Sequence, residues 1–199
     1  MTGSSPWHGG GDDCVVSDRT VISSVGHGTL SAAALAELLT GAGVAHVVDI
    51  RSFPGSRRNP QYHRDQLERW LPEAGITYSW DRRLGGRRPP QPQSPHLGLR
   101  HEAFRAYADY MATETFRAGL DSLVELAVSN RVLVMCAESV WWRCHRRLLA
   151  DALVLLCDVD VRHLFHDGRL APHPVTPAAR RVGDQLVYDV GQTASLLPG

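Results

Sequence analysis

The sequence of 199 residues contains no lysine, so all 21 of its basic side chains are arginines. This absence excludes Schiff-base catalysis by lysine and the lysine of a phosphate-binding P-loop. Long apolar runs are also absent: the longest, from Leu148 to Cys157, is interrupted by Asp151 and is far shorter than the roughly 18 residues of a membrane span. The N-terminus shows no basic segment followed by an apolar one, as a secretory signal would. We therefore expect a soluble, cytoplasmic protein without a membrane partner.

Cysteines are few, at positions Cys14, Cys136, Cys144 and Cys157. Four are too few for a disulfide scaffold in a chain of this length, and a cytoplasm would keep them reduced. Structural metal sites usually show short CxxC or HxxxH spacings, and dinucleotide sites a GxGxxG spacing; none of these occurs here. The spacings therefore predict no metal and no cofactor.

The composition is that of an ordinary globular protein, with 43% hydrophobic and 21% charged residues. The length suits one domain. Residues 1–19 are rich in glycine, serine and aspartate without periodicity, and we expect them to be disordered. Residues 20–190 are expected to form a single α/β domain, followed by a C-terminal tail over 191–199.

Within this domain, short runs rich in β-branched residues alternate with segments of helical periodicity. Strands are expected in 20–28, 44–52, 76–80, 131–139, 159–168 and 185–190, and helices in 31–43, 63–75, 101–113, 114–130 and 141–158. Residues 81–98 hold four prolines and three glycines, which predicts an irregular loop. The alternation predicts a three-layer α/β fold, Rossmann-like or flavodoxin-like, in which a mainly parallel sheet carries helices on both faces.

Ligands of such sheets bind outside the carboxyl ends of the strands. Polar residues fall at three of these ends: His27 after the first strand, Asp49 and Arg51 after the second, and Cys136 and Glu138 after the fourth. This coincidence predicts a functional site at that edge of the sheet.

The run from Cys136 to Arg146, CAESVWWRCHR, is the densest in reactive side chains. A thiol at a strand end facing a helix is a candidate nucleophile, but a cysteine phosphatase needs arginine six positions later, where Trp142 stands. The alternative for Cys136, which is favoured over the nucleophile, is a small buried residue in a tight strand-to-helix turn. Glu138 is a candidate general acid or base, or a partner in an ion pair with Arg143 or Arg146. Together with Cys144 and His145, and with His27 or His163, Cys136 also offers a zinc or iron site.

Positions 51–100 contain ten arginines and only four acidic residues. Guanidinium groups grip phosphate and other oxyanions with two hydrogen bonds at once. The proline-framed loop FPGSRRNPQY places Ser56, Arg57 and Asn59 together and suits an anionic group. Asp49 and Arg51 lie on the same side of their strand, so they can orient one another or a ligand.

Five ordered blocks, SVGHGT, VVDIRSFPGSRRNPQY, LGG, VMCAES and CHR, resemble the domain of unknown function 488 family over roughly residues 21–190. The resemblance implies a single α/β domain and no established reaction. The matching special positions are His27, Asp49, Arg51, Pro54, Ser56, Arg57, Asn59, Gly85, Cys136, Glu138, Cys144, His145 and Arg146. Between Glu138 and Cys144 this chain carries SVWWR, which departs from the family pattern and suggests an altered pocket wall.

The leading hypothesis is an enzyme that binds an anionic small molecule, a nucleotide or a phosphorylated metabolite. Its catalytic residues would be Glu138, Cys136, His27 and His145. Its substrate-binding residues would be Asp49, Arg51, Ser56, Arg57, Asn59 and Arg146. A nucleic-acid-binding module with Trp80, Trp141 and Trp142 as stacking groups is the second hypothesis, and a Cys/His metal or redox protein is the third. The sequence gives no indication of an oligomeric state.

Overall fold

The computed structural model describes residues 19–191, which form a six-stranded sheet with the order β3-β2-β4-β1-β5-β6. The strands are β1 (Val21–Gly26), β2 (His46–Asp49), β3 (Thr77–Trp80), β4 (Val132–Cys136), β5 (Asp160–Leu164) and β6 (Leu170–Pro172). The first five run parallel, and β6 pairs antiparallel with β5. The predicted strand 159–168 is therefore β5 and a turn. The expected segments 1–19 and 191–199 lie almost entirely outside the described residues.

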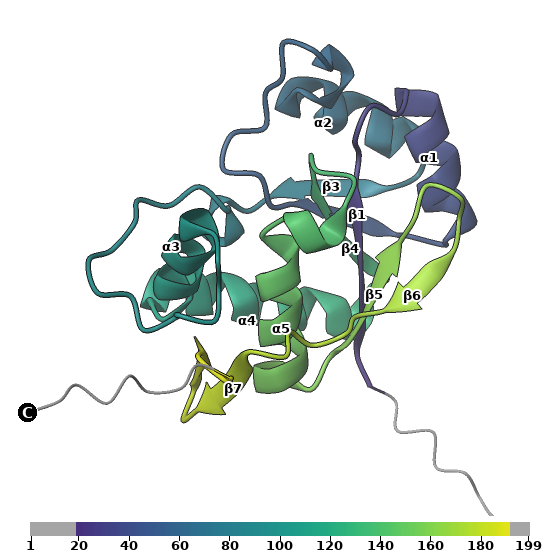
Figure 1. Cartoon of the computed structure of the whole chain (residues 1–199). Coiled ribbons are helices and arrows are strands. Elements are labelled where there is room, and N and C mark those ends of the chain that lie inside the picture. Colours follow the sequence, from purple (N-terminus) through teal and green to yellow (C-terminus); the bar gives the residue numbers. More distant parts are fainter. Residues whose placement is uncertain (1–18, 192–199) are drawn as a thin grey trace, which may run out of the picture.

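Helices cover both faces of this sheet (Figure 1). The helices are α1 (Ala32–Gly41), α2 (Arg64–Glu73), α3 (Glu102–Met111), α4 (Glu114–Ser129) and α5 (Arg146–Cys157). Two separate hydrophobic cores result. Val25 of β1 and Val47 of β2 face α1 and α2, whereas Ile22 and Val48 of the same strands face α3, α4 and α5. The predicted three-layer α/β fold is confirmed, with β4 inserted between β2 and β1, an order that differs from both strand orders of the two named folds.

The helix signals in the sequence act where they were expected. Ser31 caps α1 by accepting a hydrogen bond from the backbone N–H of Ala34 at 3.1 Å, and α2 ends within three residues of Pro72. Residues 81–98 contain only the short 3₁₀ turn η2 (Arg82–Leu84) as regular structure, as predicted. No helix in the described part of the chain is long and apolar enough to cross a membrane.

Two predicted elements differ. The helix expected over 141–158 begins only at Arg146, because Trp141–Arg143 form the separate 3₁₀ turn η3 and Cys144 is extended. The last predicted strand exists as β8 (Gln185–Tyr188), but it pairs with β7 (Ala179–Val182) in a hairpin outside the main sheet. β6 and β7 were not predicted, because three or four residues are too short for a periodicity signal.

The topology opens a crevice at one edge of the sheet. The chain leaves β1 through α1 on one face of the sheet, and it leaves the neighbouring strand β4 through α5 on the other face. Connections that diverge in this way open a crevice at the carboxyl ends of the two strands. Gly26 of β1 lies opposite Cys136 of β4 in the register, so the residues that follow them share this crevice.

Candidate functional site

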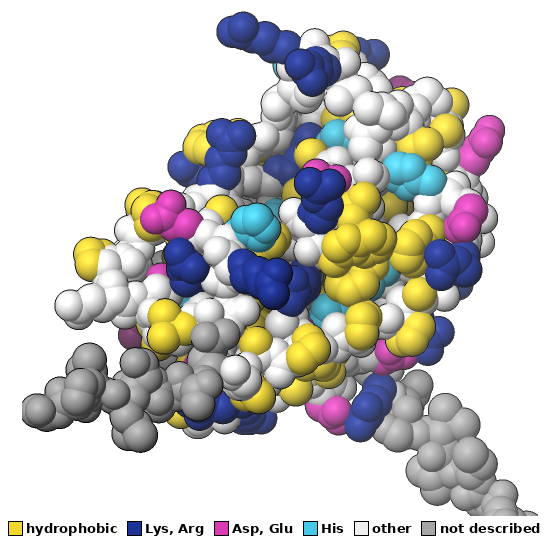
Figure 2. All heavy atoms as spheres, in the orientation of Figure 1, with side chains coloured by type: hydrophobic (Ala, Val, Ile, Leu, Met, Phe, Trp, Pro, Cys, Tyr) yellow, Lys and Arg dark blue, Asp and Glu magenta, His cyan; other side chains and the backbone are white. Residues whose placement is uncertain are grey.

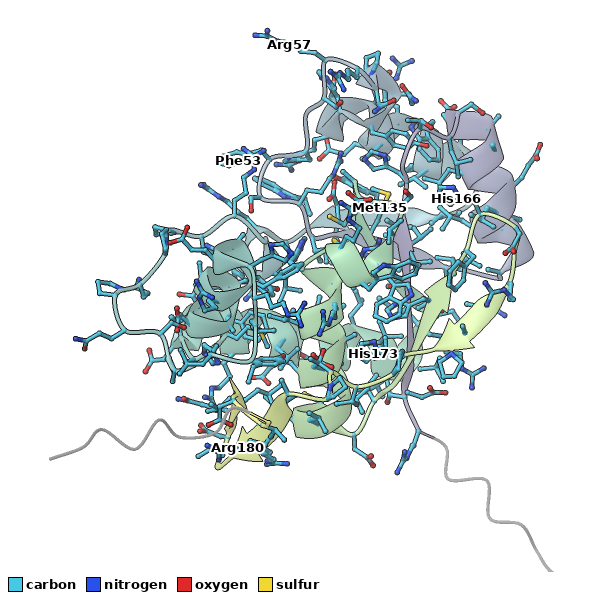
Figure 3. The ribbon with its side chains drawn as sticks, viewed as in Figure 1. Phe53, Arg57, Met135, His166, His173 and Arg180 are labelled. Atoms are coloured by element: carbon cyan, nitrogen blue, oxygen red, sulfur yellow. The ribbon has the colours of Figure 1, made fainter. Side chains whose placement is uncertain are left out.

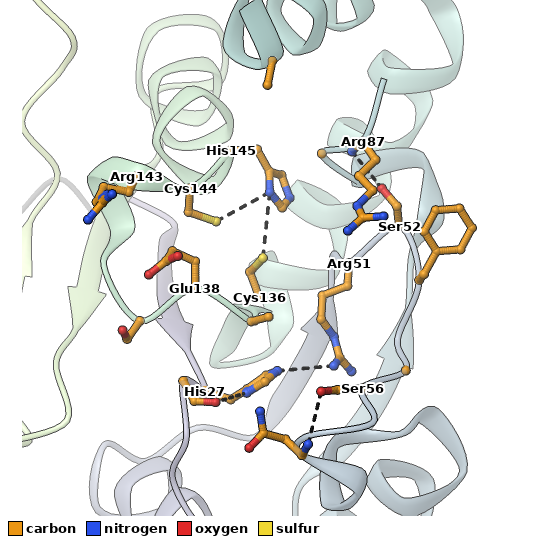
Figure 4. A pocket seen from close by; sticks show the side chains of 18 of the residues that line it. His27, Arg51, Ser52, Ser56, Arg87, Cys136, Glu138, Arg143, Cys144 and His145 are labelled. Atoms are coloured by element: carbon orange, nitrogen blue, oxygen red, sulfur yellow. Dashed lines mark hydrogen bonds between the residues drawn. The ribbon is translucent and has the colours of Figure 1, made fainter. Parts of the chain in front are cut away.

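The crevice holds a pocket of about 890 Å³ between the loops after β1, β2 and β4 and the start of α5 (Figure 4). All four predicted catalytic residues line it: His27, Cys136, Glu138 and His145. Of the predicted substrate-binding residues, Arg51, Ser56 and Asn59 line it, whereas Asp49, Arg57 and Arg146 do not. The strand ends therefore bring most of the predicted residues to one place.

At the floor of the pocket lies a thiol–imidazole cluster formed by Cys136, Cys144 and His145. Figure 4 shows both sulfurs directed at the same ring nitrogen: Nδ1 of His145 is 3.8 Å from the Cys136 sulfur and 3.5 Å from the Cys144 sulfur. The other ring nitrogen, Nε2, lies 3.2 Å from the carbonyl oxygen of Ile50. A carbonyl only accepts, so Nε2 carries a proton and Nδ1 is the ring nitrogen that faces the sulfurs.

Arg146 sits behind this cluster with only 2% of its surface exposed. Its Nε donates to the Cys144 sulfur at 3.5 Å, and its Nη2 donates to the backbone carbonyl of Glu138. The guanidinium therefore makes its hydrogen bonds behind the wall of the site. Arg146 does not line the pocket, so its contact with a substrate stays a prediction. A hydrogen bond from the Cys136 thiol, with His145 and the charge of Arg146 adding to it, holds the pKa of Cys144 well below its ordinary value. The same hydrogen bond and burial raise the pKa of Cys136.

Two glycines allow this close packing. A Cβ on Gly26 would lie 1.7 Å from the carbonyl oxygen of Glu138 and 2.7 Å from Nη2 of Arg146. A Cβ on Gly86 would lie 2.4 Å from Cγ of His145. Both distances are far inside van der Waals contact, so any side chain would displace the cluster or its support.

Arg51 and its partners form the opposite wall. Asp49, which is fully buried, accepts hydrogen bonds from Nε of Arg51 at 2.9 Å and from Nη2 at 2.5 Å. Burial would lower the pKa of Arg51, but the hydrogen bonds and charge of Asp49 outweigh it and raise that pKa. Asp49 thus orients Arg51 instead of touching the pocket.

His27 completes this wall as a neutral acceptor. Its Nδ1 donates to the carbonyl of Gly28 at 2.9 Å, and its Nε2 accepts from Nη1 of Arg51 at 3.3 Å. The ring stacks on Tyr62 with centroids 3.8 Å apart. Burial lowers the pKa of His27 to about 4, so the ring is uncharged at neutral pH.

The loop after β2 contributes some of its predicted residues. Ser56 accepts a hydrogen bond from the backbone N–H of Asn59 at 3.2 Å, and both line the pocket. Ser52, which was not singled out, accepts from the backbone N–H of Arg87 at 2.9 Å. Arg57 is exposed at the outer tip of the loop and points away from the sheet (Figure 3).

Charged side chains surround the mouth. Glu138 is exposed, and its Oε1 accepts from the backbone N–H of Val140 at 3.3 Å. Within residues 19–191 it forms no ion pair with Arg143 or Arg146. Arg143 and Arg87 are exposed and line the pocket, and the sequence did not single them out for binding. The available signal was the position of Arg143 in the CAESVWWRCHR run and of Arg87 in the 81–98 loop.

The tryptophans lie away from the pocket. Trp141 stacks on His163 with centroids 4.2 Å apart, and Trp142 is half exposed. On the face seen in Figure 2, hydrophobic side chains gather between η3 and the strands β5 and β6. Trp80, at the end of β3, donates to the carbonyl of Arg51 at 2.8 Å and lies under the guanidinium of Arg64. The three rings therefore form no common surface.

His163, an alternative metal ligand in the sequence analysis, belongs to a different network, which we call the histidine chain: Ser24, His163, His173 and Asp151. The Oγ of Ser24 lies 2.6 Å from Nδ1 of His163, Nε2 of His163 lies 3.0 Å from Nδ1 of His173, and Nε2 of His173 lies 2.9 Å from Asp151. All four residues are buried, and none lines the pocket.

Comparison with known proteins identifies one family. No curated protein and no solved structure matches the chain significantly. The model of the family described as "Domain of unknown function DUF488" matches residues 31–153, which is more than half of the chain. The match includes Asp49, Arg51 and the thiol–imidazole cluster. The chain therefore belongs to the DUF488 family.

Proposed function

We propose that the protein is an enzyme that binds an anionic substrate, a nucleotide or a phosphorylated metabolite, in the pocket at the carboxyl ends of β1, β2 and β4. The observation that carries this proposal is the meeting of arginines and the thiol–imidazole cluster in one hollow. Its volume of about 890 Å³ lies within the roughly 300–1,000 Å³ of small-molecule sites.

Positive charge at the mouth supports an anionic ligand. Arg51 is neutralised by Asp49, whereas Arg87 and Arg143 form no ion pair with a carboxylate of residues 19–191. Their guanidinium groups are therefore available to a phosphate, with Ser52, Ser56 and Asn59 as further polar groups of the lining.

The reacting groups would be the thiol–imidazole cluster and Glu138. Cys144 is the sulfur favoured as the thiolate, because Cys136 and Arg146 both donate hydrogen bonds to it. Glu138 at the mouth is placed to exchange protons with a substrate and with water. Hydrolysis or group transfer at an electrophilic centre is the chemistry that these groups support.

Ligand binding tests the proposal directly. We expect AMP or pyrophosphate to raise the melting temperature of the metal-free protein and to bind in isothermal titration. Replacing both Arg87 and Arg143 by glutamine should weaken binding by roughly 100-fold or more, because each of the two charge-assisted hydrogen bonds contributes about 1.5–3 kcal/mol.

Arg69→Gln is the matched control, since Arg69 is exposed on α2 and does not line the pocket. The proposal fails if neither ligand binds, or if the double variant binds as tightly as the Arg69→Gln control.

Nucleic-acid binding remains the alternative proposal and draws on the same arginines. The separation of Trp80 from Trp141 and Trp142 removes the common stacking surface on which it depended. Single-stranded oligonucleotide titrations at low salt would favour this alternative if binding were tight and fell steeply with added salt.

A further inference from the structure

Three soft donor atoms converge at one point of the pocket floor. The sulfurs of Cys136 and Cys144 and the Nδ1 of His145 all lie within 4.8 Å of one another. Zinc–sulfur bonds of about 2.3 Å and zinc–nitrogen bonds of about 2.0–2.1 Å place tetrahedral ligand atoms about 3.5–3.8 Å apart. The observed sulfur–nitrogen distances are 3.8 and 3.5 Å, so both sulfur–nitrogen pairs already have the spacing of ligands around a single ion, and the sulfurs lie within 4.8 Å of each other.

The imidazole is held in the orientation that a metal ligand requires. Its Nε2–H donates to the backbone carbonyl of Ile50 at 3.2 Å, which leaves the Nδ1 lone pair facing the two sulfurs. Histidine ligands of metals commonly donate their second ring N–H to a carbonyl or carboxylate in this way, which fixes the tautomer and the ring plane. Gly86 lies close against the same ring and limits its movement.

The Cys144 sulfur lies beside a buried positive charge. Cys136 and Cys144 are buried, and Nε of Arg146 donates to the Cys144 sulfur at 3.5 Å. A buried guanidinium beside a sulfur favours the negative form, and thiolate is the form that binds metal. Thiolates select soft or borderline cations such as Zn²⁺ over Mg²⁺ and Ca²⁺.

We propose that the thiol–imidazole cluster binds one Zn²⁺ through the sulfurs of Cys136 and Cys144 and Nδ1 of His145, with the fourth position open to the pocket. Each thiol that is protonated beforehand releases its proton to solvent, and no group changes oxidation state. All three ligand residues line the pocket, so the open position faces the space bordered by Glu138.

Zinc sites with three protein ligands and an open position are typical of catalysis, whereas structural sites have four protein ligands. The assignment of a catalytic role to the ion rests on the proposed function; binding of the ion does not.

The path of the chain explains why the spacing of the ligands in the sequence predicted no metal. Cys136 and Cys144 are eight positions apart, and the extended segment between η3 and α5 returns the second cysteine to the first.

Metal titration of the full-length chain, purified without an affinity tag and stripped with a chelator, tests the site. We expect one Zn²⁺ per chain, and Co²⁺ as a probe should give sulfur-to-cobalt charge-transfer bands and the intense visible bands of tetrahedral cobalt. Cys144→Ser and His145→Gln should weaken Zn²⁺ binding by more than roughly 100-fold, beyond the loss expected for a residue that only hydrogen-bonds to a ligand. Cys157→Ser is the matched control, because Cys157 is a half-buried cysteine at the end of α5 outside the cluster.

Three results would overturn the site: no charge-transfer band at saturating Co²⁺, equal loss in the Cys157→Ser control, or a Cys136–Cys144 disulfide in the isolated protein that returns two thiols only after reduction. X-ray absorption of the zinc-loaded wild-type chain covers the case of variants that do not fold. It should show two sulfurs at about 2.3 Å and one nitrogen at about 2.0–2.1 Å, and a sulfur-free shell would refute the site. These measurements use no phosphate ligand, so their failure is separate from failure of the anion pocket.

Discussion

The thiol–imidazole cluster and the histidine chain are two buried polar networks on neighbouring strands, and they differ in how completely their hydrogen bonds are used. In the histidine chain, Asp151 accepts from His173 at 2.9 Å, from the backbone N–H of Thr176 at 2.8 Å and from Tyr188 at 3.1 Å. The ring of Trp141 closes the chain by stacking on His163. In the cluster, Nδ1 of His145 faces only the two sulfurs, and all three residues line an open pocket.

The difference separates a structural role from a functional one. A buried polar network that is fully hydrogen-bonded rigidifies a core, and removing one member leaves the others unpaired at high cost. A cluster of donors left facing a hollow contributes less to stability and retains the capacity to bind. A buried histidine alone therefore does not indicate a candidate site; a histidine and two thiols that line a cavity do.

The largest expected effect is a loss of stability when the histidine chain is broken. Asp151→Ala should lower the free energy of unfolding by about 3–5 kcal/mol, because three buried donors lose their acceptor. Cys144→Ser should cost about 1 kcal/mol by the same urea denaturation measurement, since it is nearly isosteric. Asp121→Ala, at an exposed position of α4, is the control and should stay within about 0.5 kcal/mol. If Asp151→Ala costs no more than Cys144→Ser, the distinction between the networks fails.

Acid should weaken the Arg51 wall of the pocket through His27 and the histidine chain through His163. Burial lowers the pKa of His27 to about 4 and that of His163 to about 3, below the ordinary value of about 6.5. The unfolded chain therefore takes up protons below about pH 6.5 that the folded chain excludes. Stability present above pH 6.5 is lost as the pH falls towards 4, by about 2–3 kcal/mol for each histidine at pH 4.5.

His27→Gln isolates one of these contributions, because glutamine can still accept from Arg51 but does not titrate. Between pH 7 and 4.5 we expect the variant to lose about 2 kcal/mol less than the wild type in urea denaturation. His101→Gln, at an exposed position, should follow the wild type. Parallel curves for His27→Gln and the wild type would show that His27 already carries a proton when folded.

A smaller effect should follow from crowding the thiol–imidazole cluster. Gly86→Ala places a Cβ 2.4 Å from His145, and we expect a loss of about 1–3 kcal/mol in stability together with weaker Co²⁺ binding. Gly55 lines the same pocket, but a Cβ there would have no atom within 4 Å. Gly55→Ala should therefore leave stability and Co²⁺ binding close to those of the wild type. Unchanged cobalt spectra in Gly86→Ala would mean that the His145 ring position is not essential.

The smallest effect concerns Arg57, which the sequence placed among the ligand-binding residues. Because its side chain points away from the pocket, Arg57→Gln should change AMP or pyrophosphate affinity by no more than about twofold, the effect of a screened surface charge. A tenfold loss in isothermal titration would show that the loop brings Arg57 to the ligand, as the sequence analysis expected.

The sequence predicted the parts of the fold that depend on periodicity. β4, five consecutive apolar residues, and the α1 cap at Ser31 follow local rules, and the strand-end rule then placed His27, Arg51 and Cys136 in one site. The convergence of Cys144 and His145 on Cys136 was beyond these rules. It depends on the break between η3 and α5, whereas a continuous helix from position 141 was expected.

The choice among arginines could not be predicted either. Arg57, Arg87 and Arg143 are equivalent in composition, and only the paths of their loops decide which ones reach the pocket. Arg146 looked like a ligand-binding residue because it follows the reactive run, but its position at the first turn of α5 directs it inward, behind Cys144. Loop geometry and side-chain direction are set by tertiary contacts that a single sequence does not display.

The central position of β1 has a consequence for biosynthesis. This strand precedes the other strands of the described sheet along the chain, yet its sheet partners are β4 and β5, more than 100 residues later. Contacts so distant in sequence form late and slowly. The crevice between β1 and β4 can therefore exist only after residues up to at least His145 have been made, and until then the two thiols of the cluster are exposed to whatever metals and oxidants the nascent chain meets.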